Sequence, residues 1–147
     1  MTAAGDARIQ AVLSVNRAFY DAFEALDLDG MRQVWTCTSG DVCIHPGWDI
    51  HRGWSEIRES WRAIFAGTGY MRFEVTEVHM RDHAGIVQLT CIENIYAVAG
   101  AVSHHSRVAC TNLFVETDQG WRLTLHHGSP IASSMAHARP VPDETLN

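Results

Sequence analysis

Two acid–base residues stand at the ends of otherwise apolar rows. Glu93 follows Leu89 and Cys91 at alternate positions, and His127 follows Leu125 in the same way. Residues two apart in a strand share one face, so each row predicts an apolar face that ends in a titratable group. Burial raises the proton affinity of a carboxylate, as a general base requires. Glu93 and His127 are therefore each predicted to act as a general base or acid.

Two further residues can support that chemistry. His45 ends the short apolar segment 41–45 and is predicted to be the partner of the acid or base. Asn112 carries an amide that can donate a hydrogen bond to a developing oxyanion. Structural roles stay open for all four residues, because buried polar side chains commonly bond neighbouring groups and Glu93 could belong to a buried ion pair.

A metal site is an alternative use of the same side chains. His45, Glu93 and His127 would together supply two imidazoles and one carboxylate, a donor set that transition metals accept. Sequence separation does not show whether these three residues converge. Because the chain has no motif for an organic cofactor, we expect neither a cofactor nor a metal ion.

The elements that must position these residues follow from hydrophobic periodicity. Apolar residues at helical spacing predict an amphipathic helix over residues 6–26. Asp29 is predicted to cap a short second helix, and Ser55 is predicted to cap a third helix whose buried stripe includes Trp61. Segment 41–45 reads as a short strand. From Tyr70 onward, period-two patterns predict long strands at 70–81, 84–97, 101–117 and 120–129.

Short connections between the long segments fit hairpins, so these strands are predicted to form an antiparallel, strongly twisted sheet. Three helices followed by such a sheet indicate a single α+β domain over residues 6–131, with a loose tail at 132–147. Alternation on the last strand predicts that Leu125 and His127 face the interior and that His126 faces away. The predicted pocket for a small organic molecule is lined by Trp48, Trp61, Cys91, Cys110, Phe114 and Leu125.

Composition excludes several classes of function. The 147 residues include 17 acidic side chains and 11 basic ones, all arginine, so the formal net charge is −6 and Schiff-base lysine chemistry is excluded. An acidic chain without a basic stripe is a poor candidate for binding nucleic acid or anionic membranes. No apolar run approaches the roughly 18 residues that span a bilayer, and no secretory signal is recognisable. We expect a cytoplasmic protein whose cysteines stay reduced.

Five short motifs, in order along the chain, resemble the NTF2-like superfamily and, within it, the SnoaL-like branch related to the calcium/calmodulin kinase association domain. They are His45-Pro46-Gly47-Trp48, Gly53 with Ile57 and Ser60-Trp61, Cys91-Ile92-Glu93-Asn94, Thr111-Asn112-Leu113-Phe114, and the segment 121–130. Together they cover about residues 8–131. The resemblance implies a cone-shaped curved antiparallel sheet wrapped by three N-terminal helices, the NTF2-like or cystatin-like fold.

The same resemblance implies small-molecule chemistry and self-association. Isomerases, dehydratases, hydrolases and polyketide cyclases share this fold with plain binding modules, so all these reactions stay open, as does a non-catalytic ligand-binding or oligomerisation role. A homodimer packed sheet to sheet is implied as well. Outward apolar residues support it, namely Ile86, Ile92, Leu113 and Val115. Relatives often carry three consecutive histidines near the end of the domain, and the first of these positions is Leu125 here.

Overall fold

The computed structural model describes residues 3–132, so nearly all of the tail predicted at 132–147 lies outside the described residues. Helix α1 (Ala3–Glu24) occupies nearly the range predicted for the first helix. Its buried side chains recur mostly three or four positions apart, which places them on one face. They are Val12, Asn16, Phe19, Tyr20, Ala22 and Phe23. Asn16 and Tyr20 are thus polar members of an otherwise apolar face.

Helices α2 (Leu28–Val34) and α3 (Trp54–Ala66) confirm the second and third predicted helices but not their caps. Asp27, rather than Asp29, caps α2. Its extended backbone lets the carboxylate accept a hydrogen bond from the Gly30 backbone N–H at 3.0 Å.

The start of α3 depends on a glycine rather than on a capping side chain. Gly53 is the N-cap, and its φ of 81° is a left-handed conformation that glycine adopts without strain. Ser55 therefore lies inside the first turn, and the prediction that it caps the helix is wrong.

Six strands form one curved sheet in the order β2-β1-β6-β5-β4-β3. The four long strands confirm the predicted ones to within two residues at every boundary. They are β3 (Tyr70–His83), β4 (Ile86–Ala99), β5 (Val102–Thr117) and β6 (Gly120–Pro130). Successive long strands pair antiparallel, whereas β1 (Val42–Ile44) pairs parallel with β6. Strand β2 (His51–Arg52) adds a short edge that the sequence pattern does not predict.

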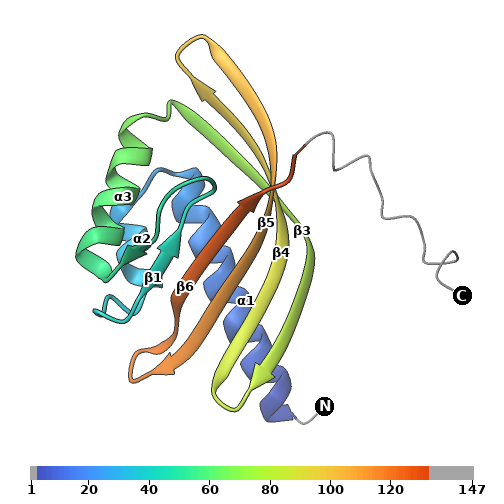
Figure 1. Ribbon diagram of the computed structural model, residues 1–147. Coiled ribbons are helices and arrows are strands. Elements are labelled where there is room, and N and C mark those ends of the chain that lie inside the picture. The colour runs from blue at the N-terminus through green and yellow to red at the C-terminus, as the bar shows by residue number, and fades with distance from the viewer. Residues whose placement is uncertain (1–2, 133–147) are drawn as a thin grey trace, which may run out of the picture.

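Figure 1 shows how the helices and the sheet are arranged. Helix α1 runs along one face of the curved sheet formed by β3 to β6, and α2 and α3 gather beside β1. The hairpin of β4 and β5 extends past the helices at one end of the molecule. The arrangement confirms the predicted α+β fold with its curved sheet and three N-terminal helices. Within residues 3–132, no helix is long and apolar enough to cross a membrane.

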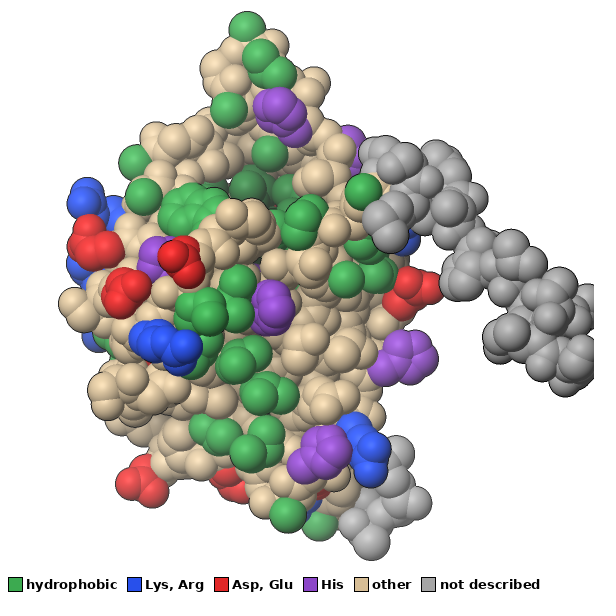
Figure 2. Space-filling view, in the orientation of Figure 1, with side chains coloured by type: hydrophobic (Ala, Val, Ile, Leu, Met, Phe, Trp, Pro, Cys, Tyr) green, Lys and Arg blue, Asp and Glu red, His purple; other side chains and the backbone are tan. Residues whose placement is uncertain are grey.

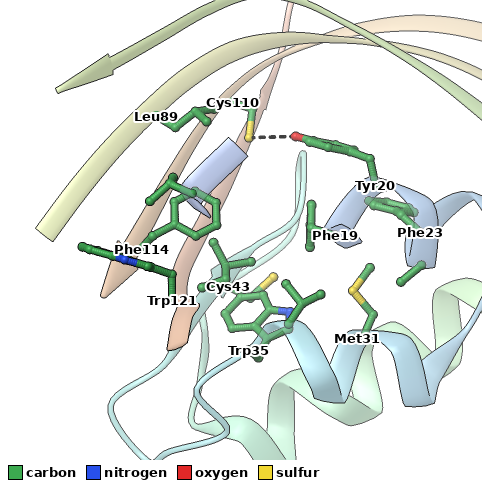
Figure 3. Close-up of a cluster of buried hydrophobic side chains, with 14 of the residues drawn as sticks. Phe19, Tyr20, Phe23, Met31, Trp35, Cys43, Leu89, Cys110, Phe114 and Trp121 are labelled. Atoms are coloured by element: carbon green, nitrogen blue, oxygen red, sulfur yellow. Dashed lines mark hydrogen bonds between the residues drawn. The ribbon is translucent and has the colours of Figure 1, made fainter. Parts of the chain in front are cut away.

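Aromatic side chains fill much of the space between the helices and the inner face of the sheet. Phe19 and Phe23 of α1 meet Trp61 of α3 edge to face, with ring centroids 5.7 and 4.6 Å apart. Figure 3 shows Trp35 and Phe114 in the same cluster. Burial of side chains of this size stabilises the fold by about 1.5–3 kcal/mol each. Trp61 and Phe114, predicted to line a pocket, are instead fully buried among these aromatic residues.

A β-bulge interrupts the regular alternation of β6. Leu113 of β5 pairs with Leu125, but the next residue, Phe114, pairs with Leu123. Thr124 is therefore an extra residue in β6. An insertion of one residue exchanges the two faces of the strand beyond it.

The bulge reverses the predicted orientation of the last residues of β6. His126 faces the interior and is 1% exposed, whereas His127 is exposed and Leu125 lies on the outer face with Leu113. The predictions that Leu125 and His127 face the interior are wrong, because they assume uninterrupted alternation along the strand.

Candidate functional site

The inner face of β4 carries a buried carboxyl group that meets a tyrosine of α1. Glu93 is 1% exposed, as strand alternation predicts. The hydroxyl of Tyr20 donates a hydrogen bond to Glu93 Oε2. The sequence pattern does not single out Tyr20, because it fits the apolar stripe of the first helix. A tyrosine on a predicted buried face is nonetheless a signal in the sequence, because a buried tyrosine hydroxyl requires a hydrogen-bond partner in the interior.

The environment of Glu93 favours its protonated form. Burial raises the pKa of the Glu93 carboxyl from 4.5 to about 7, and hydrogen bonds from Tyr20 and Cys110 limit the rise. Burial and the charge of Glu93 in turn raise the pKa of Tyr20 well above its usual value. The sequence left open that Glu93 belongs to a buried ion pair. Among residues 3–132, Glu93 forms no ion pair. The carboxyl group can therefore exchange a proton near neutral pH.

Two cysteine thiols flank the tyrosine hydroxyl. Cys91 and Cys110 lie directly opposite each other on β4 and β5, and both are buried. The Tyr20 oxygen lies 3.7 Å from Cys91 Sγ and 3.5 Å from Cys110 Sγ, the contact that Figure 3 marks with a dashed line. Cys110 Sγ in turn donates to Asn112 Oδ1 at 3.4 Å. The thiols thus connect the Tyr20–Glu93 pair to a second group of polar residues.

Amide and imidazole groups occupy the neighbouring part of the interior. Asn112 Nδ2 donates to Asn16 Oδ1 at 2.9 Å, which leaves Asn112 Oδ1 to accept a hydrogen bond from His126 Nδ1 at 2.7 Å. His126 therefore carries its proton on Nδ1 and has a lone pair at Nε2. Burial lowers the pKa of His126 to about 3, so its imidazole is neutral at physiological pH.

These residues form one connected group, which we term the inner polar cluster. Every member is 6% exposed or less. The members are Asn16, Tyr20, Cys91, Glu93, Cys110, Asn112 and His126. Three of them, Asn16, Tyr20 and His126, are not predicted as site residues from the sequence. They come from α1 and from the strand beyond the β6 bulge, and only the tertiary fold brings them to Glu93.

His45 lies apart from the inner polar cluster. The Ser60 hydroxyl donates its proton to the Ile57 carbonyl oxygen at 2.6 Å. Ser60 Oγ must therefore accept a hydrogen bond from His45 Nε2, at 2.8 Å. Burial and, to a smaller extent, the nearby His51 lower the pKa of His45 to about 4. In the described part of the chain no hydrogen bond joins His45 to Glu93. The predicted role of His45 as the partner of Glu93 is therefore not supported by a direct contact.

A groove between α1 and β3 reaches the inner polar cluster. It has a volume of about 510 Å³, and its lining includes Asn16 and Tyr20 of α1 with Phe73 and Val75 of β3. Val75 pairs with Glu93 across the two strands, so the groove passes beside the Tyr20–Glu93 pair. Grooves of a few hundred cubic ångströms that combine apolar walls with a few polar groups are typical of small-molecule sites.

The structure brings some of the predicted site residues together and separates the others. The ones in the inner polar cluster are Glu93, Asn112, Cys91 and Cys110. His127 and Leu125 lie on the opposite face of the sheet. Trp48, predicted to line the pocket, is 44% exposed and packs against His45, with ring centroids 5.0 Å apart.

Three members of the cluster could offer ligands to a metal ion. Glu93, Cys110 and His126 each present one donor atom, and these atoms lie within 4.8 Å of one another. However, the Cys110 thiol donates to Asn112 Oδ1, and an ion would have to displace that proton. The set His45, Glu93 and His127 does not converge, because His127 faces away. A site without metal stays our prediction.

The outer face of the same strands carries a separate groove of about 470 Å³, which we term the outer groove. Its lining runs from β3 to β6 and includes Thr90, Ile92, Thr111, His127 and Ser129. Figure 2 shows charged side chains gathered over α3, whereas the area over β5 and β6 carries mainly uncharged side chains and histidine.

Comparisons with known proteins identify related chains. A family model described as the SnoaL-like domain matches residues 12–133. A candidate dehydratase of the NTF2-like family from Streptomyces avermitilis is 30% identical, with a TM-score of 0.81 over 87% of this chain and 99% of that one. A candidate calcium/calmodulin-dependent protein kinase type II association domain from Thiobacillus denitrificans is 33% identical, with a TM-score of 0.69 over 80% of this chain and 93% of that one.

A curated plant protein is similar over part of its length. The F-box protein SKIP8 from Arabidopsis thaliana is 24% identical over 123 residues, which are 84% of this chain and 51% of that protein. The chain therefore spans about half the length of this curated relative. Together with the solved structures, these matches confirm the resemblance stated from the sequence motifs and the fold that it implies.

Proposed function

Because this chain belongs to the SnoaL-like domain family of NTF2-like proteins, we propose that it is an enzyme that moves a proton to or from a small organic substrate held between α1 and β3. Isomerisation, dehydration, cyclisation and hydrolysis all use such a step. The similarity to a candidate dehydratase supports this class of reaction.

The observation that carries the proposal is the buried Tyr20–Glu93 pair beside the groove. A general base works best when its pKa lies near the working pH, and burial raises the pKa of Glu93 to about 7. The hydrogen bond from Tyr20 holds the carboxyl group in one orientation, so that it can accept a proton without first rearranging.

The surroundings of the pair favour an uncharged substrate. His126 and His45, with pKa values lowered to about 3 and about 4, are neutral, and the inner polar cluster contains no arginine. A negative charge on the substrate would meet the Glu93 carboxylate, and the groove is itself lined by two carboxylates, Asp21 and Glu24, against one arginine, Arg17. Phe73 and Val75 supply apolar walls to the groove.

Replacing Glu93 tests the proposal directly. For any compound that the wild-type protein converts, Glu93→Gln should lower turnover by about 10²–10⁴-fold, which is the usual contribution of positioned proton transfer. Binding of the same compound should change much less, because the lost interaction acts in the transition state. The matched control is Glu74→Gln, which changes an exposed carboxylate on β3 and should leave turnover unaltered. If Glu93→Gln alters the melting temperature but not turnover, Glu93 does not take part in the reaction.

Replacing Tyr20 tests the pair itself. The Tyr20 hydrogen bond lowers the pKa of Glu93, so Tyr20→Phe should move the midpoint of the kcat/KM–pH profile above about 7. Carbon-13 NMR of labelled glutamate should show the same shift without any substrate. An unmoved midpoint would contradict the assignment of Glu93 as the base.

We also propose that the chain forms a homodimer through the outer face of the sheet. The similarity to an association domain supports self-association, and the outer face supplies an apolar surface, in which Ile86 is 42% exposed and Ile92 lines the outer groove. Should no compound be converted, assembly or ligand binding without catalysis is the function that this surface supports.

Light scattering tests the dimer. The wild-type protein should have the mass of two chains at micromolar concentration, and Ile92→Asp should reduce it to one by burying a carboxylate in the interface. The matched control is Ile50→Asp, which changes an isoleucine that is 42% exposed outside the long strands. A monomeric wild-type mass would overturn the proposal.

A further inference from the structure

Cys91 and Cys110 are members of the inner polar cluster to which the proposed proton transfer assigns no role. They are directly opposite residues of β4 and β5, and they are 4% and 3% exposed. Opposite residues of an antiparallel pair have Cα atoms about 4.5 or 5.5 Å apart, and disulfides join residues whose Cα atoms lie about 4.4–6.8 Å apart. Both sulfur atoms lie within 3.7 Å of the Tyr20 oxygen, so both side chains point to the same side. The backbone is thus already spaced for a disulfide.

We propose that Cys91 and Cys110 form a redox-active dithiol that a small peroxide oxidises to a cross-strand disulfide inside the inner polar cluster. The groove between α1 and β3 gives a small oxidant a route, since it is lined by Tyr20, whose oxygen touches both sulfur atoms. The two remaining cysteines lack this arrangement. Cys37 Sγ donates to the carbonyl oxygen of Arg32, and Cys43 lies beside His45.

The oxidation balances with hydrogen peroxide as the oxidant. The Cys91 thiolate attacks one peroxide oxygen and becomes a sulfenic acid, while the other oxygen takes up a proton and leaves as water. The Cys110 sulfur then displaces the sulfenic hydroxyl, which leaves as a second water, and the S–S bond forms. Cys91 suits the attacking role, because the neighbouring Cys110 thiol and then the Tyr20 hydroxyl lower the pKa of its own thiol.

Oxidation would also regulate the site, and this consequence rests on the proposed acid–base function. The Cys110 thiol has a single proton, which Asn112 and Glu93 share as acceptors, and a disulfide sulfur carries none. Because the hydrogen bond from Cys110 lowers the pKa of Glu93, its loss raises that pKa. The midpoint of the pH profile should therefore move upward in the oxidised protein.

Trypsin offers a direct readout of the disulfide. Arg107 lies between the two cysteines and the chain has no lysine, so Cys91 falls in peptide 82–107 and Cys110 in peptide 108–122. Cys37 and Cys43 share peptide 33–52. After treatment of the native protein with hydrogen peroxide and alkylation of free thiols, we expect peptides 82–107 and 108–122 to be linked, with a mass two hydrogens below their sum. Two of the four thiols should be lost and dithiothreitol should restore them.

Matched variants make the result specific. Cys91→Ser and Cys110→Ser should each abolish the linked peptides, whereas Cys43→Ser, which changes another buried thiol, should leave them unchanged. Oxidation of all four thiols at one rate, or failure to link the two peptides, would overturn the proposal. Because mass, and not turnover, reports the disulfide, a failure here is separate from a failure of the proton-transfer function.

Discussion

The inner polar cluster and the outer groove lie on opposite faces of the same strands and use similar residue types. Each includes a histidine of β6, and these two histidines are neighbours in the sequence. His126 is buried and bonded to Asn112, and burial lowers its pKa to about 3. His127 is exposed beside Thr111 and Ser129. Residue type is thus the same, and the environment differs.

The difference teaches that fixed partners and loss of water make a group chemically useful. Burial disfavours the charged forms of Tyr20, Glu93 and His126 in the inner polar cluster, so their pKa values move toward the neutral forms. Hydrogen bonds between the buried side chains also hold each group in one orientation. On the outer face, water competes for the same groups. The inner face therefore suits proton transfer, and the outer face suits contact with another chain.

The largest difference in stability between the two faces is expected on replacing Asn112, on the inner face, or its neighbour Thr111, on the outer face. Asn112→Ala should lower the free energy of unfolding by about 4 kcal/mol, because it leaves both the His126 N–H and Asn16 Oδ1 buried without a partner. Thr111→Ala, on the outer face, should cost less than about 1 kcal/mol. Denaturant unfolding of both variants measures the comparison, and equal losses would break it.

Glu93 should make stability depend on pH. Its folded-state pKa is raised from 4.5 to about 7, so its contribution to stability is complete below pH 4.5 and is lost as pH rises through 7. That difference corresponds to about 3 kcal/mol. Glu93→Gln should therefore gain stability relative to the wild-type protein between pH 4.5 and pH 8, as thermal unfolding can measure. The exposed Glu74→Gln variant should gain nothing, and a pH-independent effect of Glu93→Gln would contradict the burial argument.

The adjacent histidines provide a sharper test with a smaller effect. His126→Ala should cost about 2 kcal/mol at pH 8, whereas His127→Ala should stay within about 0.5 kcal/mol. The folded-state pKa of His126 is lowered to about 3, so the wild-type protein loses stability as pH falls below 6.5, where the unfolded chain binds a proton that the folded chain does not. The cost of His126→Ala should thus shrink at pH 5. Similar costs for the two variants would mean that β6 has no bulge in solution.

Metal removal should have no effect on either face. The protons of His126 and Cys110 already satisfy Asn112 Oδ1, so the inner polar cluster needs no ion for its hydrogen bonds. A chelator should leave the melting temperature unchanged, and elemental analysis should find far less than one transition metal per chain. About one zinc, iron or copper per chain, lost in His126→Ala but kept in His127→Ala, would show instead that Glu93, Cys110 and His126 form a metal site.

The sequence by itself determined the elements and the interior position of Glu93. Helical and period-two patterns arise from local geometry, so they located three helices and four long strands to within a few residues. Glu93 and Asn112 lie on strands whose alternation is uninterrupted around them, and both face the interior as predicted. The order of these elements together with the SnoaL-like motifs then indicated the fold.

Only the tertiary structure decided which side chains meet. Tyr20 reaches Glu93 across 73 positions of sequence, and Asn16 reaches Asn112 across 96, distances over which local pattern carries no information. His126 faces the interior in place of the predicted His127 because β6 contains one extra residue. The position of that residue is set by pairing with β5. A bulge of one residue leaves no clear pattern in the composition of the strand. It nevertheless turns every side chain beyond it to the opposite face of the sheet. Alternation therefore predicts a face only as far as the register stays regular.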